Sequence, residues 1–386
     1  MKIVIAPDSF KESLTALQVA DAIAAGMREV WPDATYVKVP VADGGEGTVQ
    51  AMIDALGGRR VDVRVTGPLG QVVDAFYGDA DGVAVIEMAA ASGLEGVPPD
   101  LRDPRTATSR GTGELIRAAL DAGAAKLVLG VGGSATNDGG AGMLQALGVR
   151  LLDADGRDLG PGGAELARLD RIDASGLDAR VREAEFHIAC DVDNPLVGPR
   201  GASAVFGPQK GATPDMVREL DAALAHFADV IRRDLGQDVA QLPGAGAGGG
   251  IAAAMVVFLQ GQLRPGIEIV TEAVGLDAQV RDADLVVTGE GRIDGQTVNG
   301  KTPMGVAKVA RRHGKPVVAI GGSLARDADA VYTAGIEVVV AAVARPCSVA
   351  EALGAADENL RRAARNLAAA LALGRRLQLQ TPNLQQ

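Results

Sequence analysis

Cysteine and histidine are scarce in this 386-residue chain. The two cysteines, Cys190 and Cys347, lie far apart, which excludes a disulfide-based scaffold and favours a reducing, cytoplasmic setting. The three histidines are His187, His226 and His313, and no two of them have the spacing of metal ligands. A zinc site is therefore not expected.

Aromatic residues, excess positive charge and long apolar runs are also lacking. Aromatics make up 3% of the chain, too few for base-stacking platforms, and the formal net charge of −11 leaves no basic footprint. The most apolar run, Ile251–Leu259, is far shorter than the ~20 residues that span a bilayer. We expect a cytoplasmic protein whose partners are small molecules, not nucleic acid or membrane. Nothing in the sequence indicates an oligomeric state.

Hydrophobic residues and glycine are abundant instead. Hydrophobic residues make up 47% of the chain, which is ample for a buried core. The 51 glycines are about twice the usual share of ~7% and follow no collagen period. Such a content is typical of many tight turns and of backbone that approaches ligands closely. The length suggests two domains of ~100–200 residues each, or one large α/β unit.

Short runs rich in Val and Ile alternate with segments of helical periodicity. Residues Lys2–Ala6 are typical of a buried strand, and Ser13–Val30 of an amphipathic helix that Ser13 can cap. The strand pattern returns late in the chain, at Leu285–Thr288, Pro316–Ile320 and Ile336–Val343. This alternation predicts an α/β fold with parallel strands and right-handed crossovers.

The middle of the chain has a different texture. A hairpin-like pair is expected around Asp153–Gly156, and a long helix at Asp215–Leu235. The glycine run Gly244–Gly250 is either a linker or the turn that enters a second helical stretch.

Polar residues gather where the predicted strands end. In an open α/β sheet the carboxyl ends of the strands are the edge at which ligands bind. Because several strand ends share this character, we predict a functional cleft there. The segments concerned are Ala6–Ser13, Ala42–Thr48, Gly130–Gly140, Cys190–Pro195 and Thr288–Gly295.

Glycine pairs in two of these segments fit an anion-binding role. Gly132–Ser134 and Gly44–Gly45 can point backbone N–H groups at an oxyanion, and a following helix would add its positive end. The alternative for each pair is a tight turn without a ligand.

Carboxylates and cations occupy the same segments. Magnesium prefers carboxylate, water and phosphate oxygens, although each carboxylate could instead cap a helix or a turn. The candidates are Asp8, Asp43, Glu46, Asp138, Asp191, Asp193, Glu290 and Asp294. The cations that could neutralise a phosphate or a substrate carboxylate are Lys11, Lys210, Arg292 and Lys301.

The segment Gly295–Thr302 matches the P-loop pattern G-x-x-x-x-G-K-[ST]. A P-loop must start where a strand stops, and here the predicted strand ends near Thr288. We therefore interpret the match as coincidental and do not expect the Thr302 hydroxyl to be a metal ligand. Lys301 could still meet a phosphate in another geometry.

Taken together, these loops resemble the bacterial type-1 glycerate kinases. The resemblance rests on APDSFKESL, VPVADGGEGT, TSRGTGELI, GVGGSATNDGGAG, ACDVDNPL, FGPQKGA, LRPGIEIV and TGEGRID, in this order, and covers Lys2 to about Leu373. It implies ATP-dependent, Mg²⁺-dependent phosphorylation of D-glycerate, with 2-phosphoglycerate the favoured product.

The resemblance also implies a domain organisation. A discontinuous Rossmann-like domain would comprise residues 1–75 and 284–386, with a second α/β domain, residues 76–283, inserted in it. The active site would lie in the cleft between the two domains.

The chemistry of phosphoryl transfer assigns expected roles to the candidate residues. Asp191 or Asp43 would be the base for the glycerate hydroxyl, with Lys210 as a third catalytic group. Substrate-binding residues would be Ser9, Lys11 and Arg292, and the metal candidates are Asp8, Glu46, Asp138, Glu290 and Asp294. Nucleotide and phosphate groups would bind at Gly132, Gly133, Ser134, Thr136, Asn137, Gly44 and Gly45.

Other functions remain as alternatives. A nucleotide-dependent dehydrogenase would need G-x-G-x-x-G after the first strand, where this chain has Pro7–Glu12. A glycerate 3-kinase would differ only in its product. A non-catalytic protein that closes on a small acid would not need so many acidic loop residues.

Overall fold

The computed structural model describes residues 1–298 and 300–380. The chain forms two compact units. Unit 1 comprises Met1–Asp43, Gln50–Leu56 and the described residues from Val270 onward, and unit 2 comprises Gly44–Val49 and Gly57–Ile269. The units therefore divide the chain at other positions than the expected boundaries near residues 75 and 284.

A five-stranded sheet forms the centre of unit 1. All its neighbouring strands are parallel, and the chain passes from β1 to β2 at one edge before it returns to the central strand β11 on the other side of β1. This reversal makes β1 and β11 the topological switch point of a doubly wound sheet. In order, the strands are β13 (Val338–Ala341), β12 (Val317–Leu324), β11 (Leu285–Ile293), β1 (Lys2–Ile5) and β2 (Thr35–Lys38).

Helices cover both faces of this sheet. On one face α1 (Ala16–Arg28) and α14 (Ala356–Gln380) lie side by side and bury Ile5, Ile23 and Leu360 in one core. Strand alternation turns Val4 to the opposite face, where α11 (Thr302–Arg312) packs against β11 and β12. The expected Rossmann-like parallel sheet is thus confirmed.

Helix α1 starts three residues later than the sequence suggested. Its cap is Thr15, whose hydroxyl accepts a hydrogen bond from the backbone N–H of Gln18, while the Gln18 side chain accepts one from the Thr15 N–H. Ser13, the expected cap, donates instead to the backbone oxygen of Leu353. Ser13 therefore joins the start of the chain to its C-terminal helices.

Unit 2 contains a six-stranded mixed sheet. Neighbouring strands are parallel from β10 to β5, whereas β5, β4 and β3 are antiparallel. Because β3 pairs with β4 along its whole length, residues 57–75 belong to this unit, which explains the earlier boundary. In order, the strands are β10 (Gln262–Arg264), β9 (Glu185–Ala189), β6 (Lys126–Gly130), β5 (Val83–Glu87), β4 (Val72–Ala80) and β3 (Arg59–Thr66).

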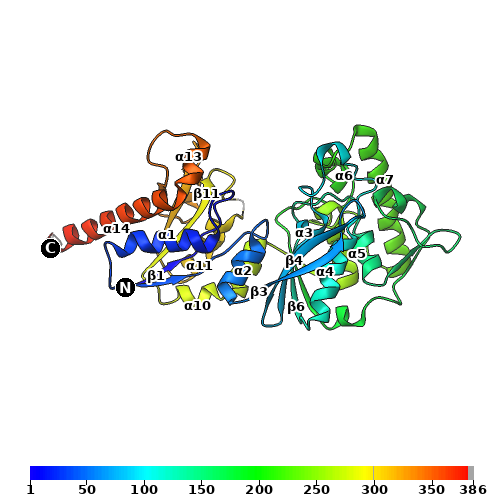
Figure 1. The fold of residues 1–386 in the computed structure, drawn as a ribbon, viewed down its shortest axis with the longest axis horizontal. Helices are drawn as coiled ribbons and strands as arrows, with labels where there is room; N and C mark the ends of the chain where they lie inside the picture. Colours follow the sequence, from blue (N-terminus) through cyan, green and yellow to red (C-terminus); the bar gives the residue numbers. More distant parts are fainter. Residues whose placement is uncertain (299, 381–386) are drawn as a thin grey trace. The chain divides into compact units, whose positions relative to one another are not determined.

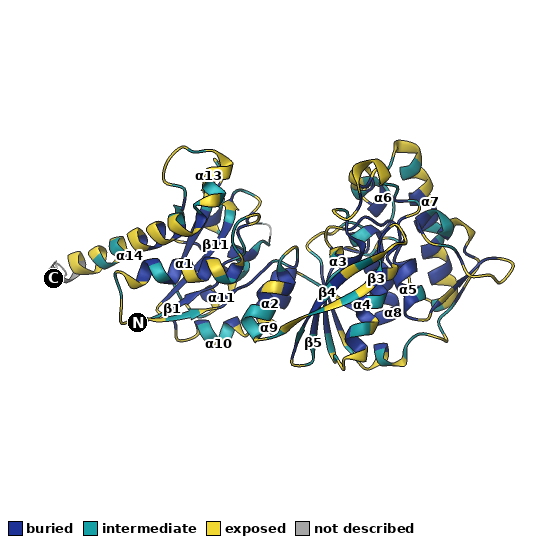
Figure 2. Cartoon of the chain, viewed as in Figure 1, coloured by how far each residue is buried: buried dark blue, intermediate teal, exposed yellow. Residues whose placement is uncertain are grey.

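The core of unit 2 is formed by this sheet and four main helices. Leu115, Leu144, Phe227 and Met255 are buried in one cluster, and Figure 2 shows the inner strands and inward helix faces as buried, whereas much of β3 is exposed. The run Gly244–Gly250 is a helix-entry turn rather than a linker. The four helices are α4 (Arg110–Asp121), α5 (Ala141–Ala146), α7 (Pro214–Leu235) and α8 (Ile251–Leu259).

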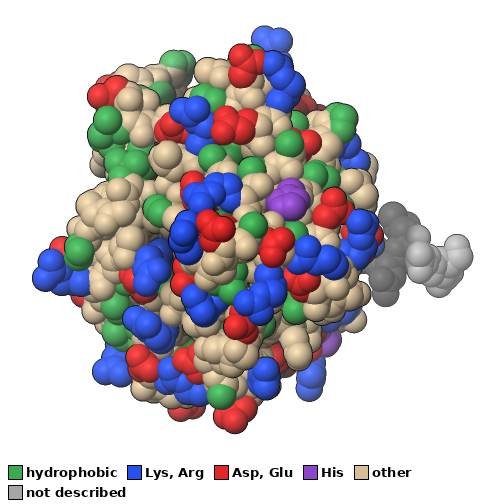
Figure 3. Space-filling view, turned by 90° about the vertical axis from the view of Figure 1, so that its right-hand side faces the viewer, with side chains coloured by type: hydrophobic (Ala, Val, Ile, Leu, Met, Phe, Trp, Pro, Cys, Tyr) green, Lys and Arg blue, Asp and Glu red, His purple; other side chains and the backbone are tan. Residues whose placement is uncertain are grey.

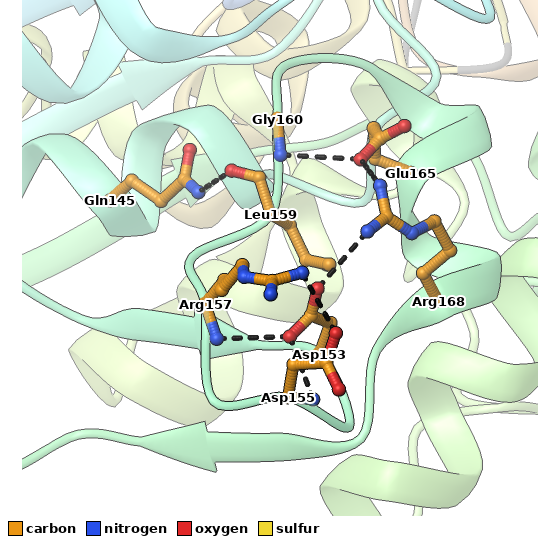
Figure 4. A network of polar contacts seen from close by, with 8 residues as sticks. All are labelled: Gln145, Asp153, Asp155, Arg157, Leu159, Gly160, Glu165 and Arg168. Carbon is orange, nitrogen blue, oxygen red and sulfur yellow. Dashed lines mark hydrogen bonds and ion pairs between the residues drawn. The ribbon is translucent and has the colours of Figure 1, made fainter.

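A polar network closes the turn that follows β7 (Arg150–Leu152), which pairs with β8 (Arg171–Asp173) (Figure 4). The Asp153 carboxylate accepts hydrogen bonds from the backbone N–H of Arg157 and from the Arg168 guanidinium, at 2.9 and 3.0 Å. The expected turn at Asp153–Gly156 is present, and its strand partner comes from farther along the chain.

Shorter helices complete the two units. They are α2 (Thr48–Leu56), α3 (Ala89–Ser92), α6 (Ala202–Phe206), α9 (Gly266–Ala273), α10 (Leu276–Val280), α12 (Ala330–Thr333) and α13 (Val349–Gly354). None of the helices in the described part of the chain is both long and apolar enough to cross a membrane. Basic and acidic side chains are interspersed on the face drawn in Figure 3.

The contact between α1 and α14 yields a stability prediction. A Cβ on Gly26 would lie 2.1 Å from the backbone oxygen of Arg361, so Gly26→Ala must push the two helices apart. We expect a loss of about 1–3 kcal/mol in the free energy of unfolding, despite the higher helix propensity of alanine. Urea unfolding measures the change.

Gly374 of α14 is the matched control, because no atom lies within 4 Å of the position that its Cβ would take. Gly374→Ala should gain about 0.5–1 kcal/mol. Equal gains at both positions would show that the two helices do not approach as closely as described.

Candidate active site

A cavity opens at the switch point of unit 1. Its volume is about 570 Å³, and it is lined by the last residues of β11 and β12, by residues that follow β1 and β13, and by α13 and the start of α14. We call it the switch-point cavity. The sequence-predicted residues in its wall are Asp8, Ser9, Lys11, Asp43, Glu290 and Arg292, and Lys301 lines it as well. All three expected substrate-binding residues thus meet in one place.

Asp8 stands directly beyond β1 at this cavity. Its carboxylate accepts hydrogen bonds from the backbone N–H of Ser9 at 2.7 Å and from the Thr302 hydroxyl at 2.5 Å. Burial, and after it the charge of the neighbouring Asp43, raise the pKa of Asp8 to about 6, and the hydrogen bond from Thr302 opposes the rise.

Glu290 lies near the end of β11, the strand next to β1. It is buried, and its carboxylate accepts a hydrogen bond from the Thr297 hydroxyl at 2.5 Å. Burial raises the pKa of Glu290 to about 7, against the hydrogen bond from Thr297 and the charge of Lys301, and Asp8 adds to the rise. Asp8 and Glu290 are therefore two buried carboxyl groups with raised pKa values, and the charge of Asp8 is one cause of the rise at Glu290.

The two hydroxyls come from the segment that matches the P-loop pattern. We call the Thr297–Glu290 and Thr302–Asp8 contacts the hydroxyl clamp. Strand β11 runs on to Ile293 through its pairing with β12, so the argument that the strand ends near Thr288 was wrong. Yet Thr302 starts α11 with its hydroxyl on a carboxylate of the chain itself, and residue 299 within the pattern lies outside the described residues.

The carboxylates at the switch point suit magnesium better than a metal that needs a full set of protein ligands. The described residues contain no group of three His, Cys, Asp or Glu side chains placed to hold a metal. Asp8 and Glu290 form a pair, and Mg²⁺ is commonly held by one or two carboxylates together with water and substrate phosphates. Asp294, also a metal candidate, lies 3.4 Å from Lys301 and 3.8 Å from Arg292.

Asp138 in unit 2 is a structural residue. Its fully buried carboxylate accepts hydrogen bonds from the N–H and the hydroxyl of Ser109 and from the N–H groups of Gly140 and Gly142. These four bonds tie the starts of α4 and α5 together and use the lone pairs that a metal would need. These contacts give Asp138 a structural role, and the metal role expected for it stays a prediction.

Lys210 is buried beneath the loop that follows β6. Its ammonium group donates to the Ser134 hydroxyl and to the backbone oxygen of Thr136, both at 2.7 Å. Burial lowers the pKa of Lys210 to about 7, and Asp138 opposes the shift. The Asn137 side chain donates to the hydroxyl of Ser203 in α6. Side chains of this loop are therefore bound by residues from other parts of unit 2.

Gly132 and Gly133 are the exposed part of the same loop. A ligand in solvent could reach their backbone N–H groups. Their expected role in phosphate binding stays a prediction. Thr136 and Asn137 are buried, and the Asn137 Oδ1 atom has no hydrogen-bond partner among the described residues, so their expected role stays a prediction as well.

The second glycine pair precedes α2, and a carboxylate of the chain already caps that helix. Glu87, at the end of β5, accepts a hydrogen bond from the N–H of Val49 at 2.9 Å, and the N–H groups of Gly47 and Thr48 also lower its pKa against the effect of burial. Gly44 has a φ of 96°, and a Cβ there would lie 2.7 Å from that of Ala189. Close packing thus accounts for this glycine without a ligand.

Asp191 follows β9 and is exposed. Its carboxylate accepts a hydrogen bond from the N–H of Gly266 at 3.1 Å, the first residue of α9. Asp193 is ion-paired with Arg200 at 2.8 Å, and Glu46 is exposed. A side chain in the position of Asp191 is fixed by the fold yet open to a ligand.

Sequence reasoning missed three functional or capping residues: Thr297, Thr302 as a carboxylate partner, and Glu87. Only the P-loop pattern drew attention to two of them, and it suggested a different partner. A doubly wound parallel sheet with carboxylates and cations at its switch point is the arrangement of an α/β enzyme that handles anionic ligands.

Comparison with known proteins identifies the family. The model of the glycerate kinase family matches residues 3–372. The chain is 57% identical to the glycerate kinase of Bacillus subtilis strain 168, over 97% of this chain and 99% of that one. It is 56% identical to the glycerate 2-kinase of Escherichia coli strain K12, with the same coverage.

A solved structure agrees with the fold. The crystal structure of a proposed glycerate kinase 2 from Salmonella typhimurium LT2 superposes with a TM-score of 0.91 at 58% sequence identity, covering 97% of this chain and 99% of that one. This chain belongs to the glycerate kinase family. The resemblance carried by the loop motifs is confirmed, and the α/β fold with it.

The hydroxyl clamp yields a prediction about the titration of Asp8. Thr302→Val removes the hydrogen bond that stabilises the ionised carboxylate, so the pKa of Asp8 should rise by about one unit above its value near 6. Carbon-13 NMR of labelled aspartate follows this titration directly, with Asp8→Asn to assign the resonance. Thr302→Ser keeps the hydroxyl and should restore the parent value.

The same shift fixes a stability sign. The folded-state pKa of Asp8 lies above its ordinary value of 3.8, so this carboxyl favours folding most at low pH. That contribution is lost as the pH rises from about 4 to about 6. Unchanged titration in Thr302→Val would contradict the clamp.

Proposed function

We propose that this chain transfers the γ-phosphoryl group of ATP to the 2-hydroxyl of D-glycerate and releases ADP and 2-phosphoglycerate. The observation that carries the proposal is the switch-point cavity, with paired carboxylates and several cations, in a chain 56% identical to a glycerate 2-kinase over nearly its full length.

The reaction requires one bond to form and one to break. The glycerate hydroxyl oxygen bonds to the γ-phosphorus, the bond from that phosphorus to the β–γ bridging oxygen breaks, and the hydroxyl proton passes to a base. The protein contributes mainly positioning and charge stabilisation, since the charge of the transferred group spreads over its oxygens.

Asp8 and Glu290 are the residues that would hold Mg²⁺. Their carboxylates share the switch point, and the hydroxyl clamp orients both. When bound, the ion supplies charge neutralisation at the phosphate oxygens. The raised pKa values of Asp8 and Glu290 mean that both must lose protons before they serve as ligands, so function should weaken as the pH falls below about 7.

Cations in the wall of the same cavity suit the anionic groups of both substrates. Arg292 can bind a carboxylate with two parallel hydrogen bonds, which makes it the leading partner for the carboxylate of glycerate, with Lys11 as the alternative. Ser9 adds a hydroxyl beside Asp8. Lys301 adds a third positive charge to the cavity wall, 3.4 Å from the Asp294 carboxylate.

Two carboxylates compete for the role of base. Asp43 lines the switch-point cavity and acts on the charge of Asp8, whereas Asp191 is held by the N–H of Gly266 and is open to solvent. Lys210 acts, in this proposal, as a positioning residue that fixes the Gly132–Ser134 loop from beneath.

A turnover assay tests the proposed activity. Purified protein should release ADP from ATP only when D-glycerate and Mg²⁺ are both present. Phosphorus-31 NMR of the product should show 2-phosphoglycerate. The 3-phosphate would identify a glycerate 3-kinase, and binding of glycerate without ADP release would favour a non-catalytic binding protein.

Paired substitutions test the base. Replacing the true base by asparagine keeps the side-chain size and should lower kcat by about 10²–10⁴-fold with little change in thermal stability. Asp43→Asn and Asp191→Asn are measured side by side at pH 8. The variant with the larger loss marks the base, and a loss that excess Mg²⁺ restores marks a metal ligand instead. If both variants keep parent kcat, neither carboxylate is the base.

A further inference from the structure

The switch-point cavity is larger than glycerate requires. Pockets of roughly 300–1,000 Å³ accommodate ligands of drug size, and this cavity measures about 570 Å³. Glycerate is a small hydroxy acid and would fill only a fraction of that space. A second, larger ligand or ligand part is needed to occupy the rest.

The two ends of the cavity differ in chemistry. Asp8, Glu290 and the cations lie at the carboxyl ends of β1 and β11. The remainder of the wall is largely apolar, with hydroxyls from Ser13, Ser323 and Ser348, and comes from the loop after β1, the residues after β13, and α13 with the start of α14. Its apolar residues are Phe10, Val343, Val349, Ala352, Leu353 and Ala356.

This polarity matches a nucleotide better than any small acid. A nucleoside triphosphate has an apolar, planar base at one end and a polyanion at the other. With its phosphates at Lys11 and Lys301, near the carboxylates that suit magnesium, its base would extend over the apolar wall. Asn359, one turn after Ala356 on α14, lines the same part of the cavity and carries an amide that can hydrogen-bond with a base edge.

We propose that the apolar end of the switch-point cavity binds the adenine and ribose of ATP. The proposal rests on the proposed kinase function for the identity of the nucleotide. It moves the nucleoside to unit 1, away from the glycine loops at residues 44–45 and 132–134. Those loops have their own structural duties in unit 2, as the Glu87 cap and the Lys210 contacts indicate.

Cys347 provides a reporter at this end. It lines the cavity and is a free thiol of intermediate exposure. Cys190 in unit 2 is the internal control, because burial raises its pKa and its thiol donates to the backbone oxygen of Val192. Alkylation of both residues by iodoacetamide in the parent protein is followed by peptide mass spectrometry.

Nucleotide should protect Cys347 selectively. With MgATP or MgADP at 100 times its Kd, only ~1% of sites are empty, so alkylation of Cys347 should slow at least ~10-fold. D-Glycerate should give no protection. Adenosine alone should protect at higher concentration, whereas inorganic tripolyphosphate should not, because the reporter sits at the base and not at the phosphates.

A filling substitution gives an independent readout. Ala352→Phe places a ring in the apolar end and should raise the KM for ATP at least ~10-fold, with the KM for glycerate changing less than ~2-fold. Ala370→Phe is the matched control, since Ala370 is exposed on α14 outside the cavity wall. Thermal unfolding of both variants shows whether they fold.

The outcomes separate this proposal from the proposed function. Protection of Cys347 by ATP without turnover of glycerate would keep the nucleoside site and overturn the substrate. Turnover of glycerate with no protection by ATP or adenosine would overturn the nucleoside site and return the nucleotide to unit 2. Protection by tripolyphosphate as strong as that by ATP would also overturn it, because phosphates alone would then occupy the apolar end.

Discussion

The pairing of β1 with β11 is the constraint on which the site depends. Ile3–Ile5 lie in parallel register with Leu285–Val287, so the two ends of the chain are joined in the middle of one sheet. This pairing brings Asp8 and Glu290 to the same edge, and no shorter-range contact would do so. The chain forms unit 2 between β1 and β11. The site residues still meet, because the hydrogen bonds between these two strands, and not closeness in the sequence, bring them together.

The consequence is two buried carboxyl groups at one edge of the sheet whose pKa values burial raises, with Asp43 adding to the rise at Asp8 and Asp8 adding to the rise at Glu290. Burying two acids side by side opposes ionisation, and the hydroxyl clamp reduces that cost through hydrogen bonds to the charged forms. Carboxyl groups with such raised pKa values are typical of functional sites. Burial raises the pKa of Asp138 too, but its carboxylate accepts four hydrogen bonds from Ser109, Gly140 and Gly142 and does not line the cavity.

Local patterns in the sequence predicted the alternation of strands and helices and the crowding of polar residues at strand ends. They also predicted that Asp8, Lys11 and Arg292 belong to one functional cleft, and the structure places all three in the wall of one cavity. The extent of β11 was underestimated because pairing with β12, not local propensity, carries the strand to Ile293. The bonds from Ser109 to Asp138 and from Val49 to Glu87 were not predicted for the same reason, since these partners lie far apart in the chain.

The glycine loops illustrate why a motif alone does not identify a ligand. Gly44 resembles an anion loop, yet the helix it precedes takes its negative partner from Glu87, and the close approach of Ala189 already requires a glycine there. At the switch point, in contrast, burial raises the pKa values of Asp8 and Glu290, and Lys11, Arg292 and Lys301 line the same large cavity. Buried carboxyl groups with raised pKa values beside cations and open volume are therefore a stronger argument for a functional site than the glycine pattern is.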